Sequence, residues 1–565
     1  MTNKKTTKPK TKTTLSQKQK TAIGIGLLGV LLIAILVGVV FVFQNKTDEF
    51  SVNTGVDAST LTGDAQTLTV GEDGVEITSG GIYELKTNIE SGCVIVRADN
   101  ADVELILNNV SITNSDGPAI YVESADNFYL QLVGSNTLVA TTSSDYNGAI
   151  YSKDDILIYG DGSLDITSNI DGIVGKDDLQ IDGGKFTISA EDDGIVGKDS
   201  VKVTGGVFDI TAGGDGFKTS NETEKGDAEF TGGTFTINTG SDGLQIIANL
   251  LISGGTFDIT AGNGSGTTST SSQWLGSNTS DSSSTKGIKA DSSVQIDSGT
   301  ITVNSQDDAF HSNGNVTING GVINLASGDD GMHADNDLTV NGGTINITKA
   351  YEGIEGGTIT INDGDIKVVA SDDGFNAAGG SDTTSGRVGG QNNFAGDTSK
   401  VLAINGGTIY VNASGDGLDS NGNLYIAGGT TYVDGPTNNG NGPIDYGDSG
   451  CEFKITGGTL IAVGSSGMAV NATSATQTTV MINLTSSYTG ALTFGDISYS
   501  PAKSYQSVLI SSDKLSLGST YTLKINDTDV QSVTLNNVIT TSGTAGMQPG
   551  MGQGRQGGMQ GGGRR

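Results

Sequence analysis

Acidic residues at a fixed position before a glycine are the residues in this sequence best suited to chemistry. An acid, a small residue and an apolar residue follow one another, as in Asp171-Gly172-Ile173. We call these acids the acid column: Asp171, Asp193, Asp215, Asp242, Asp308, Asp330, Glu352, Asp373 and Asp416. Clustered carboxylates suit Ca²⁺, which prefers oxygen ligands. The alternative is that Asp-Gly only forms a turn.

Calcium is therefore the predicted cofactor, most of all where the acid is doubled by a second Asp. The predicted ligands are Asp192, Asp193, Asp215, Asp307, Asp308, Asp329, Asp330, Asp335, Asp372 and Asp373. Ala309 stands where the other units have glycine, and Glu352 replaces aspartate, so calcium is less firmly predicted at those two units.

A second series lies three residues after each acid and is predicted to point outward by strand alternation. We call it the outward row: Val174, Val196, Lys218, Gln245, Lys289, His311, His333, Glu355, Asn376 and Asp419. Both histidines of the chain belong to it. The row predicts a groove for a polar or anionic chain, with Lys218, Lys289, His311, His333, Glu355 and Asn376 binding the ligand. A solvated strand face and a transition-metal pair at the two histidines are the alternatives. Binding is expected to strengthen below about pH 6.5, as the histidines gain charge.

These positions require a repeating scaffold, and the sequence has one. The acid recurs at 171, 193 and 215, and again at 308, 330 and 352, at intervals of 22 residues. Each unit divides into three short strands separated by glycine-rich corners, which predicts an all-β, single-stranded parallel β-helix with three strands per rung. Equivalent side chains then lie about 4.8 Å apart along the stack.

The ends of the chain predict a membrane anchor. Residues 22–43 form an apolar run, long enough to span a bilayer as one transmembrane helix, and lysines precede it. The predicted organisation is a basic cytoplasmic tail (1–21), the anchor (22–43), a tether (44–62), a β-rich N-terminal cap (63–115), the β-helix (116–471), a small C-terminal β-domain (472–542) and a glycine-rich tail (543–565). A cleaved signal peptide is the alternative. The net charge of −33 argues against a nucleic-acid partner.

The order of these motifs resembles a family of bacterial extracellular carbohydrate-binding proteins. The resemblance rests on the DDGI, SDDGF and GDGL turns, the GGTF and GGTI strands, the Gly/Ser loop before a Lys, and the Gly/Met/Arg tail. It covers about residues 57–540. It implies a right-handed β-helix similar in shape to polysaccharide lyases, calcium at the doubled acids, and binding of cellulose or acidic, pectin-type sugars.

A monomeric polysaccharide-binding protein on the bacterial cell surface is the leading functional prediction. The first alternative is a calcium-dependent pectate-lyase-like enzyme in which Lys289 or Lys218 removes the proton during β-elimination. The second alternative is a structural envelope scaffold or adhesin. No compact catalytic constellation stands out in the sequence, so enzymatic activity stays an open question at this point.

Overall fold

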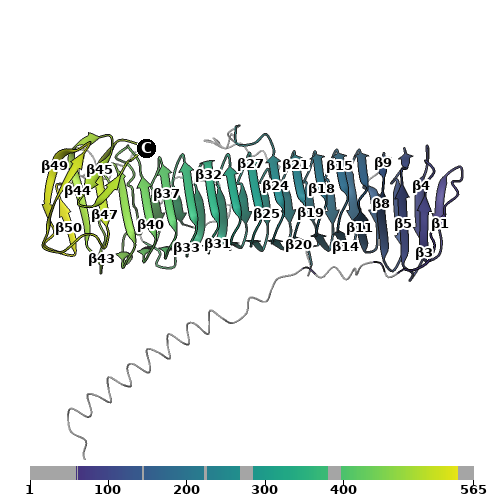
Figure 1. Ribbon diagram of the computed structural model, residues 1–565, viewed down its shortest axis with the longest axis horizontal. Coiled ribbons are helices and arrows are strands. Elements are labelled where there is room, and N and C mark those ends of the chain that lie inside the picture. The colour runs from purple at the N-terminus through teal and green to yellow at the C-terminus, as the bar shows by residue number, and fades with distance from the viewer. Residues whose placement is uncertain are drawn as a thin grey trace, which may run out of the picture. The chain divides into compact units, whose positions relative to one another are not determined.

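The structure is a computed structural model that describes Val52, Ser59 and residues 61–142, 146–221, 225–266, 284–378 and 396–544. These residues belong to the second of two compact units, 52–565. Their regular secondary structure is entirely β, and most strands pair in parallel in long sheets (Figure 1), consistent with the predicted parallel β-helix. The basic tail, the anchor and nearly all of the C-terminal tail lie outside the described residues. Within the described ranges, no helix is long and apolar enough to cross a membrane.

Three rows of strands make up the stack. The first row contains β2 (Gly74–Ile77), β4 (Cys93–Arg97), β7 (Ile120–Ser124), β10 (Gly148–Ser152), β13 (Asp171–Gly175), β16 (Ile195–Gly197), β19 (Phe217–Thr219), β22 (Leu244–Ile246), β25 (Ile288–Ala290), β28 (Phe310–Ser312), β31 (Met332–Val340), β33 (Ile354–Ile361), β35 (Phe375–Ala377) and β38 (Leu418–Ser420). This row carries the acid column at its start and the outward row within it.

The second row begins with β1 (Gln66–Thr67) and shares the long strands β31 and β33 with the first. Its other members are β3 (Gly81–Leu85), β5 (Val103–Asn108), β8 (Phe128–Val133), β11 (Ile156–Gly160), β14 (Asp178–Ile181), β17 (Ser200–Val203), β20 (Asp227–Phe230), β23 (Asn249–Ile252), β26 (Ser293–Ile296), β29 (Asn315–Ile318), β36 (Val401–Ile404), β39 (Asn423–Ile426), β41 (Phe453–Ile455) and β43 (Ser474–Ala475). Parallel pairing thus extends into the segment 63–115, the predicted cap.

The third row alternates buried and exposed residues most regularly. It contains β6 (Ser111–Asn114), β9 (Ser135–Ala140), β12 (Ser163–Ser168), β15 (Lys185–Ala190), β18 (Val207–Ala212), β21 (Thr234–Thr239), β24 (Thr256–Ala261), β27 (Thr300–Ser305), β30 (Val322–Ala326), β32 (Thr344–Ala350), β34 (Asp365–Ala370), β37 (Thr408–Ala413), β40 (Thr430–Asp434) and β42 (Thr459–Gly464). The six residues of β18 alternate between exposed and buried, starting with an exposed residue. The phenylalanine of the GGxF motif is therefore buried and points into the core, which explains why the motif repeats.

Identical residues meet inside the core because the repeat keeps its register. Phe186, Phe208, Phe235 and Phe257 occupy equivalent positions on successive third-row strands. Their rings stack with centroids 4.9, 4.8 and 4.4 Å apart and are fully buried. The core is therefore a continuous apolar column, which each coil builds only with its neighbours.

The chain after residue 472 departs from this pattern. β44 (Thr479–Tyr488) pairs in parallel with β50 (Ile539–Ser542) and antiparallel with β47 (Tyr505–Ser511), and β47 also pairs antiparallel with β42 of the stack. A separate antiparallel sheet follows the order β46 (Ile497–Tyr499), β45 (Leu492–Phe494), β48 (Thr520–Ile525), β49 (Thr528–Thr534). These strands give the last coils a covered edge, which limits strand-to-strand aggregation.

Candidate functional site

The acid column is a hydrogen-bonded feature of the backbone stack. One carboxylate oxygen of Asp171 accepts the backbone N–H of Asp193 at 3.0 Å, and Asp193 accepts that of Asp215 at 2.8 Å. The same contact recurs from Asp215 to Asp242 at 2.9 Å and from Asp308 to Asp330 at 2.9 Å. On these coils the acid is therefore more than a turn residue, because its carboxylate bonds to the backbone of the next coil.

Glycine follows the acid for a reason of space. A Cβ on Gly194 would lie 2.6 Å from the carbonyl oxygen of Gly216 and 2.7 Å from Cγ2 of Ile210. The position has no left-handed backbone requirement, but the next coil and the third row leave almost no room for a side chain. Ala309, fully buried, is the residue with a Cβ that follows a member of the acid column, and Ala119 and Ala149 occupy the same position on earlier coils that have no acid there.

The outward row is in register from coil to coil, as the repeat predicts. Lys218 lies opposite Gln245, and Lys289 opposite His311. His311 lies opposite His333, which in turn lies opposite Glu355. Glu355, Asn376 and Asp419 continue the row. Three members also contact the acid-column residue three positions earlier: Lys218 contacts Asp215, His311 contacts Asp308 and His333 contacts Asp330.

Lys218 is held by the acid column. Its Nζ lies 2.8 Å from Asp215 and 3.0 Å from Asp193. Burial would lower the pKa of Lys218, but the two carboxylates outweigh burial and raise it above its ordinary value. A lysine kept protonated in this way is a poor proton acceptor, which makes Lys218 a less suitable base for a lyase than a lysine without such partners. Lys289 is half-buried in the same row.

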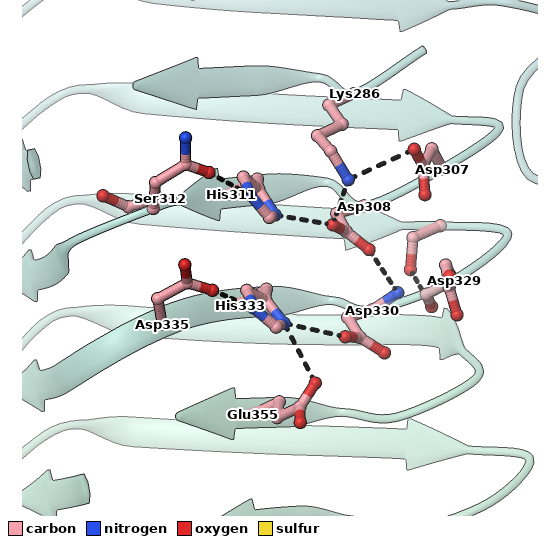
Figure 2. A network of polar contacts seen from close by, with 12 residues as sticks. Lys286, Asp307, Asp308, His311, Ser312, Asp329, Asp330, His333, Asp335 and Glu355 are labelled. Carbon is pink, nitrogen blue, oxygen red and sulfur yellow. Dashed lines mark hydrogen bonds and ion pairs between the residues drawn. The ribbon is translucent and has the colours of Figure 1, made fainter. Parts of the chain in front are cut away.

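Lys286 is the residue that sequence reasoning missed. It occupies the acid position of its own coil, where its backbone N–H bonds to Asp242 at 2.7 Å. Its buried ammonium reaches the next coil and lies 2.5 Å from Asp308 and 3.2 Å from Asp307, as Figure 2 shows. The signal was present in the sequence, since Lys286-Gly287-Ile288 has the spacing of Asp-Gly-Ile.

The two histidines are stacked side by side and buried. Their ring centroids are 4.8 Å apart with an interplanar angle of 9°, and each is 2% exposed. His311 contacts Asp308 at 2.9 Å through Nδ1 and Asn313 at 2.9 Å through Nε2. The prediction that they face ligand in an open groove is therefore wrong as the structure stands, because each ring is enclosed by polar protein groups.

His333 is the most strongly embedded of the pair. Nδ1 lies 2.9 Å from Glu355 and 3.2 Å from Asp330, and Nε2 lies 3.1 Å from Asp335 (Figure 2). Burial would lower the pKa of His333, but Asp330 and Glu355 raise it to about 12. His333 is thus charged across the physiological range, which contradicts the expectation that it gains charge below about pH 6.5.

Positive charge therefore already neutralises the middle of the acid column. Burial would raise the pKa of Asp308, but the Lys286 ammonium and His311 hold it below its ordinary value. Among the predicted metal ligands, Asp193 and Asp215 contact Lys218, Asp307 and Asp308 contact Lys286, and Asp330 and Asp335 contact His333. A cation at these coils would have to compete with the protein's own charges.

The C-terminal coils have a different charge balance. In the described chain no lysine, arginine or histidine pairs with Glu352, Asp373, Asp416, Asp419 or Asp445. Burial and neighbouring acids raise the pKa of Glu352 to about 8, of Asp416 to about 7 and of Asp373 to about 6. The pKa values of Asp419 and Asp445 are also raised, chiefly by burial. Asn376 lies among them and its Oδ1 is buried without a hydrogen-bond partner.

Four groups of side chains place three potential metal ligands close together in the described chain. Three contain predicted residues: Asp171 with Asp192 and Asp193, Asp307 with Asp308 and Asp329, and Asp330 with His333 and Glu355. The fourth, Asp155 with Asp177 and Asp178, was not predicted. Asp372 precedes Asp373 in the C-terminal group described above.

Stacked parallel coils with an in-register row of polar side chains define a repeat protein of the kind that binds extended ligands. A model of the carbohydrate-binding domain-containing protein family matches residues 71–331 and 329–480. The chain belongs to this family.

Two further similarities are to a protein of Acetivibrio thermocellus and to a solved structure from C. thermocellum. A carbohydrate-binding domain-containing protein of A. thermocellus is 33% identical over 129 residues, which is 21% of this chain and 45% of that protein. The chain thus matches less than half the length of this relative. The gadolinium derivative of a polysaccharide lyase-like protein from C. thermocellum is 31% identical, with a TM-score of 0.30, and the match covers 34% of this chain and 87% of that one.

Proposed function

We propose that this protein holds polysaccharide, cellulose or an acidic pectin-like glycan, along the face that carries the outward row. The observation that supports the proposal most is the unbroken register of this row, from Val174 to Asp419, in a chain of the carbohydrate-binding family. The half-buried polar members of the row recur at the spacing of the coils, so a linear polymer could contact several coils at once; they are Lys218, Gln245, Lys289, Glu355 and Asp419.

We further propose that Ca²⁺ binds this protein, at the C-terminal coils more than at the other doubled acids. Asp372, Asp373, Asp416, Asp419 and Asp445 supply oxygen donors with no protein cation beside them, and the unpartnered Oδ1 of Asn376 is a further candidate donor. The ion would stabilise the ionised form of these carboxylates against burial and neighbouring acids, and it could bridge to ligand carboxylates. Asp192 with Asp193 is the next candidate, although Lys218 already contacts Asp193.

The cellular setting is also a proposal. The apolar run at 22–43, preceded by lysines, would anchor the chain with the body on the bacterial cell surface. We infer a right-handed sense for the coils, since connections between parallel strands are right-handed in nearly all proteins. A monomer is the expected state.

The test is binding of the full-length protein, kept in mild detergent, to insoluble cellulose and to polygalacturonate, with and without a chelator. We expect retention on at least one of them, and stronger retention of the acidic glycan with Ca²⁺. Retention on neither glycan would contradict the proposal. Ultraviolet absorbance of unsaturated sugars, measured in the same samples, separates binding from lyase activity, with Lys289 the more suitable candidate base.

A further inference from the structure

A cluster of three tyrosines lies at the N-terminal end of the same face. Tyr121 and Tyr151 occupy the outward-row position on β7 and β10, where they lie opposite one another. Tyr146 covers both, with ring centroids 4.9 Å from Tyr121 and 5.8 Å from Tyr151. Tyr121 and Tyr151 are buried, but Tyr146 is 39% exposed. The cluster thus presents one aromatic ring to solvent on a rigid aromatic support.

Three lysines line the same end of the face. Lys153, Lys176 and Lys198 follow the outward-row position by two residues on three consecutive coils, which pair in register. The ammonium of Lys153 lies 5.5 Å from the ring centroid of Tyr121, and that of Lys176 lies 5.3 Å from that of Tyr151. Lys153 and Lys198 are exposed and Lys176 is half-buried. The backbone positions of the three lysines are therefore repeated at the coil spacing, about 4.8 Å.

Five acids directly follow these lysines in the chain, and each has another partner; they are Asp154, Asp155, Asp177, Asp178 and Asp199. Asp155 accepts the N–H of Asp178 at 3.1 Å, and Asp178 accepts the hydroxyl of Ser200 at 2.7 Å. Asp177 lies 3.4 Å from Lys225. Asp154 accepts the N–H of Ala125 at 2.8 Å, and Asp199 lies 2.8 Å from Lys225. Glu123 pairs with Arg97. Within the described ranges, none of the three lysines forms an ion pair with a carboxylate. Although the adjoining acids outnumber the three lysines, those acids have other partners, and the lysine ammonium groups can therefore pair with an anion.

We propose that Tyr121, Tyr146, Tyr151, Lys153, Lys176 and Lys198 form a platform that binds a polysaccharide carrying a carboxylate on each sugar, without calcium. The exposed Tyr146 ring would take the apolar face of one sugar ring, and the lysines would form charge-assisted hydrogen bonds to carboxylates of successive sugars. The idea rests on the proposed function and assigns the acidic ligand to one end of the face. Calcium would serve the opposite, acidic end.

Charge and shape together favour this ligand over a neutral glycan. A neutral chain could stack on Tyr146 but would leave the lysines without counter-charge. Burial lowers the pKa of Lys176, and a bound carboxylate would offset that cost. Binding at exposed lysines is screened by salt, so affinity should fall as ionic strength rises.

The experiment is titration of the full-length protein with oligogalacturonate in excess chelator. We expect the variant K153Q/K176Q/K198Q to bind at least about tenfold more weakly, since each charge-assisted hydrogen bond contributes substantially. The control K185Q/K367Q/K514Q removes three exposed lysines elsewhere and should bind like the parent. Y146A should weaken binding severalfold, whereas Y351A, another exposed tyrosine, should not.

The possible results distinguish failure of the tyrosine and lysine platform from failure of the proposed polysaccharide binding. Equal affinity of the two triple-lysine variants would overturn the platform. So would binding of oligogalacturonate only when calcium is present, although that result would leave the proposed function standing. Failure to bind any glycan under any condition would contradict both. The affinity of K153Q/K176Q/K198Q for a soluble neutral cellulose derivative is measured as well. If it falls as much as the affinity for oligogalacturonate, the lysines do not bind carboxylates specifically.

Discussion

Lys286 supplies a positive charge to the buried network of acids and histidines around Asp308. Its ammonium lies between Asp307 and Asp308 on the coil after its own. Asp308 is 2% exposed, and one of its carboxylate oxygens already accepts the backbone N–H of Asp330. Removing the lysine would leave a buried carboxylate with only the neighbouring imidazoles to balance it.

We therefore predict that Lys286→Met lowers the free energy of unfolding by roughly 3–5 kcal/mol, the usual cost of breaking a buried pair. Denaturant unfolding followed by circular dichroism is the measurement. Lys289→Met, at a half-buried row position, should cost about 1 kcal/mol or less. Adding Asp308→Asn to Lys286→Met should recover much of the loss, because the amide oxygen can still accept the backbone N–H. No difference between Lys286→Met and Lys289→Met would show that the pair contributes little.

The first-row strand and the turn before it are the elements on which the repeat depends. The glycine after each acid packs against the carbonyl of the next coil, so its role is spatial. A Cβ on Gly216 would meet the oxygen of Gly243 at 2.5 Å and Cγ2 of Ile237 at 2.6 Å. The natural Ala309 shows that one coil accommodates a methyl group with its own local packing.

Gly216→Ala is expected to destabilise the protein by about 1–3 kcal/mol, as overpacking of a tight core does. The matched control is Gly266→Ala, where the new Cβ would meet nothing within 4 Å. Thermal unfolding of both variants, with the parent alongside, is the measurement. A Gly216→Ala protein as stable as Gly266→Ala would mean that neighbouring coils separate easily, contrary to the close stacking described above.

The repeat made it possible to predict which residues share a row. The side-chain contacts between neighbouring coils could not be predicted in the same way. The 22-residue interval fixed which residues share a row, and so placed His311 beside His333. Their burial could not be read from the interval, because it depends on Asp330, Asp335, Asn313 and Glu355 closing around the rings. Lys286 was not predicted as part of the site because its position in the repeat holds an acid on the neighbouring coils, and a cation does not match that pattern.

Charge is distributed unevenly along the whole body. Tyrosines and lysines occupy the N-terminal end of the face, ion pairs its middle, and acids without cationic partners its C-terminal end. The raised pKa values of Glu352, Asp373 and Asp416 mean that the folded state binds more protons than the unfolded chain between about pH 4 and 8. Stability from these groups is present at low pH and is lost as pH rises through that window.

In excess chelator, the full-length protein should therefore become less stable as the pH is raised from about 5 to about 8. Calcium should restore stability at the higher pH more than at the lower, since the ion binds ionised carboxylates. Denaturation midpoints at both pH values, with and without calcium, are the measurement. In the control Glu352→Gln/Asp416→Asn the pH dependence should be weaker. A flat profile in chelator would contradict the account of the acidic end.

The central claim is that polysaccharide lies along the first-row face, and amide hydrogen exchange tests it most directly. The full-length protein is compared with and without saturating polysaccharide, and peptides from the three rows are followed separately. We predict slower exchange in first-row peptides such as those containing β10, β28 and β35, with third-row peptides such as β18 and β37 unchanged. Protection confined to the third row, or none at saturation, would contradict the claim.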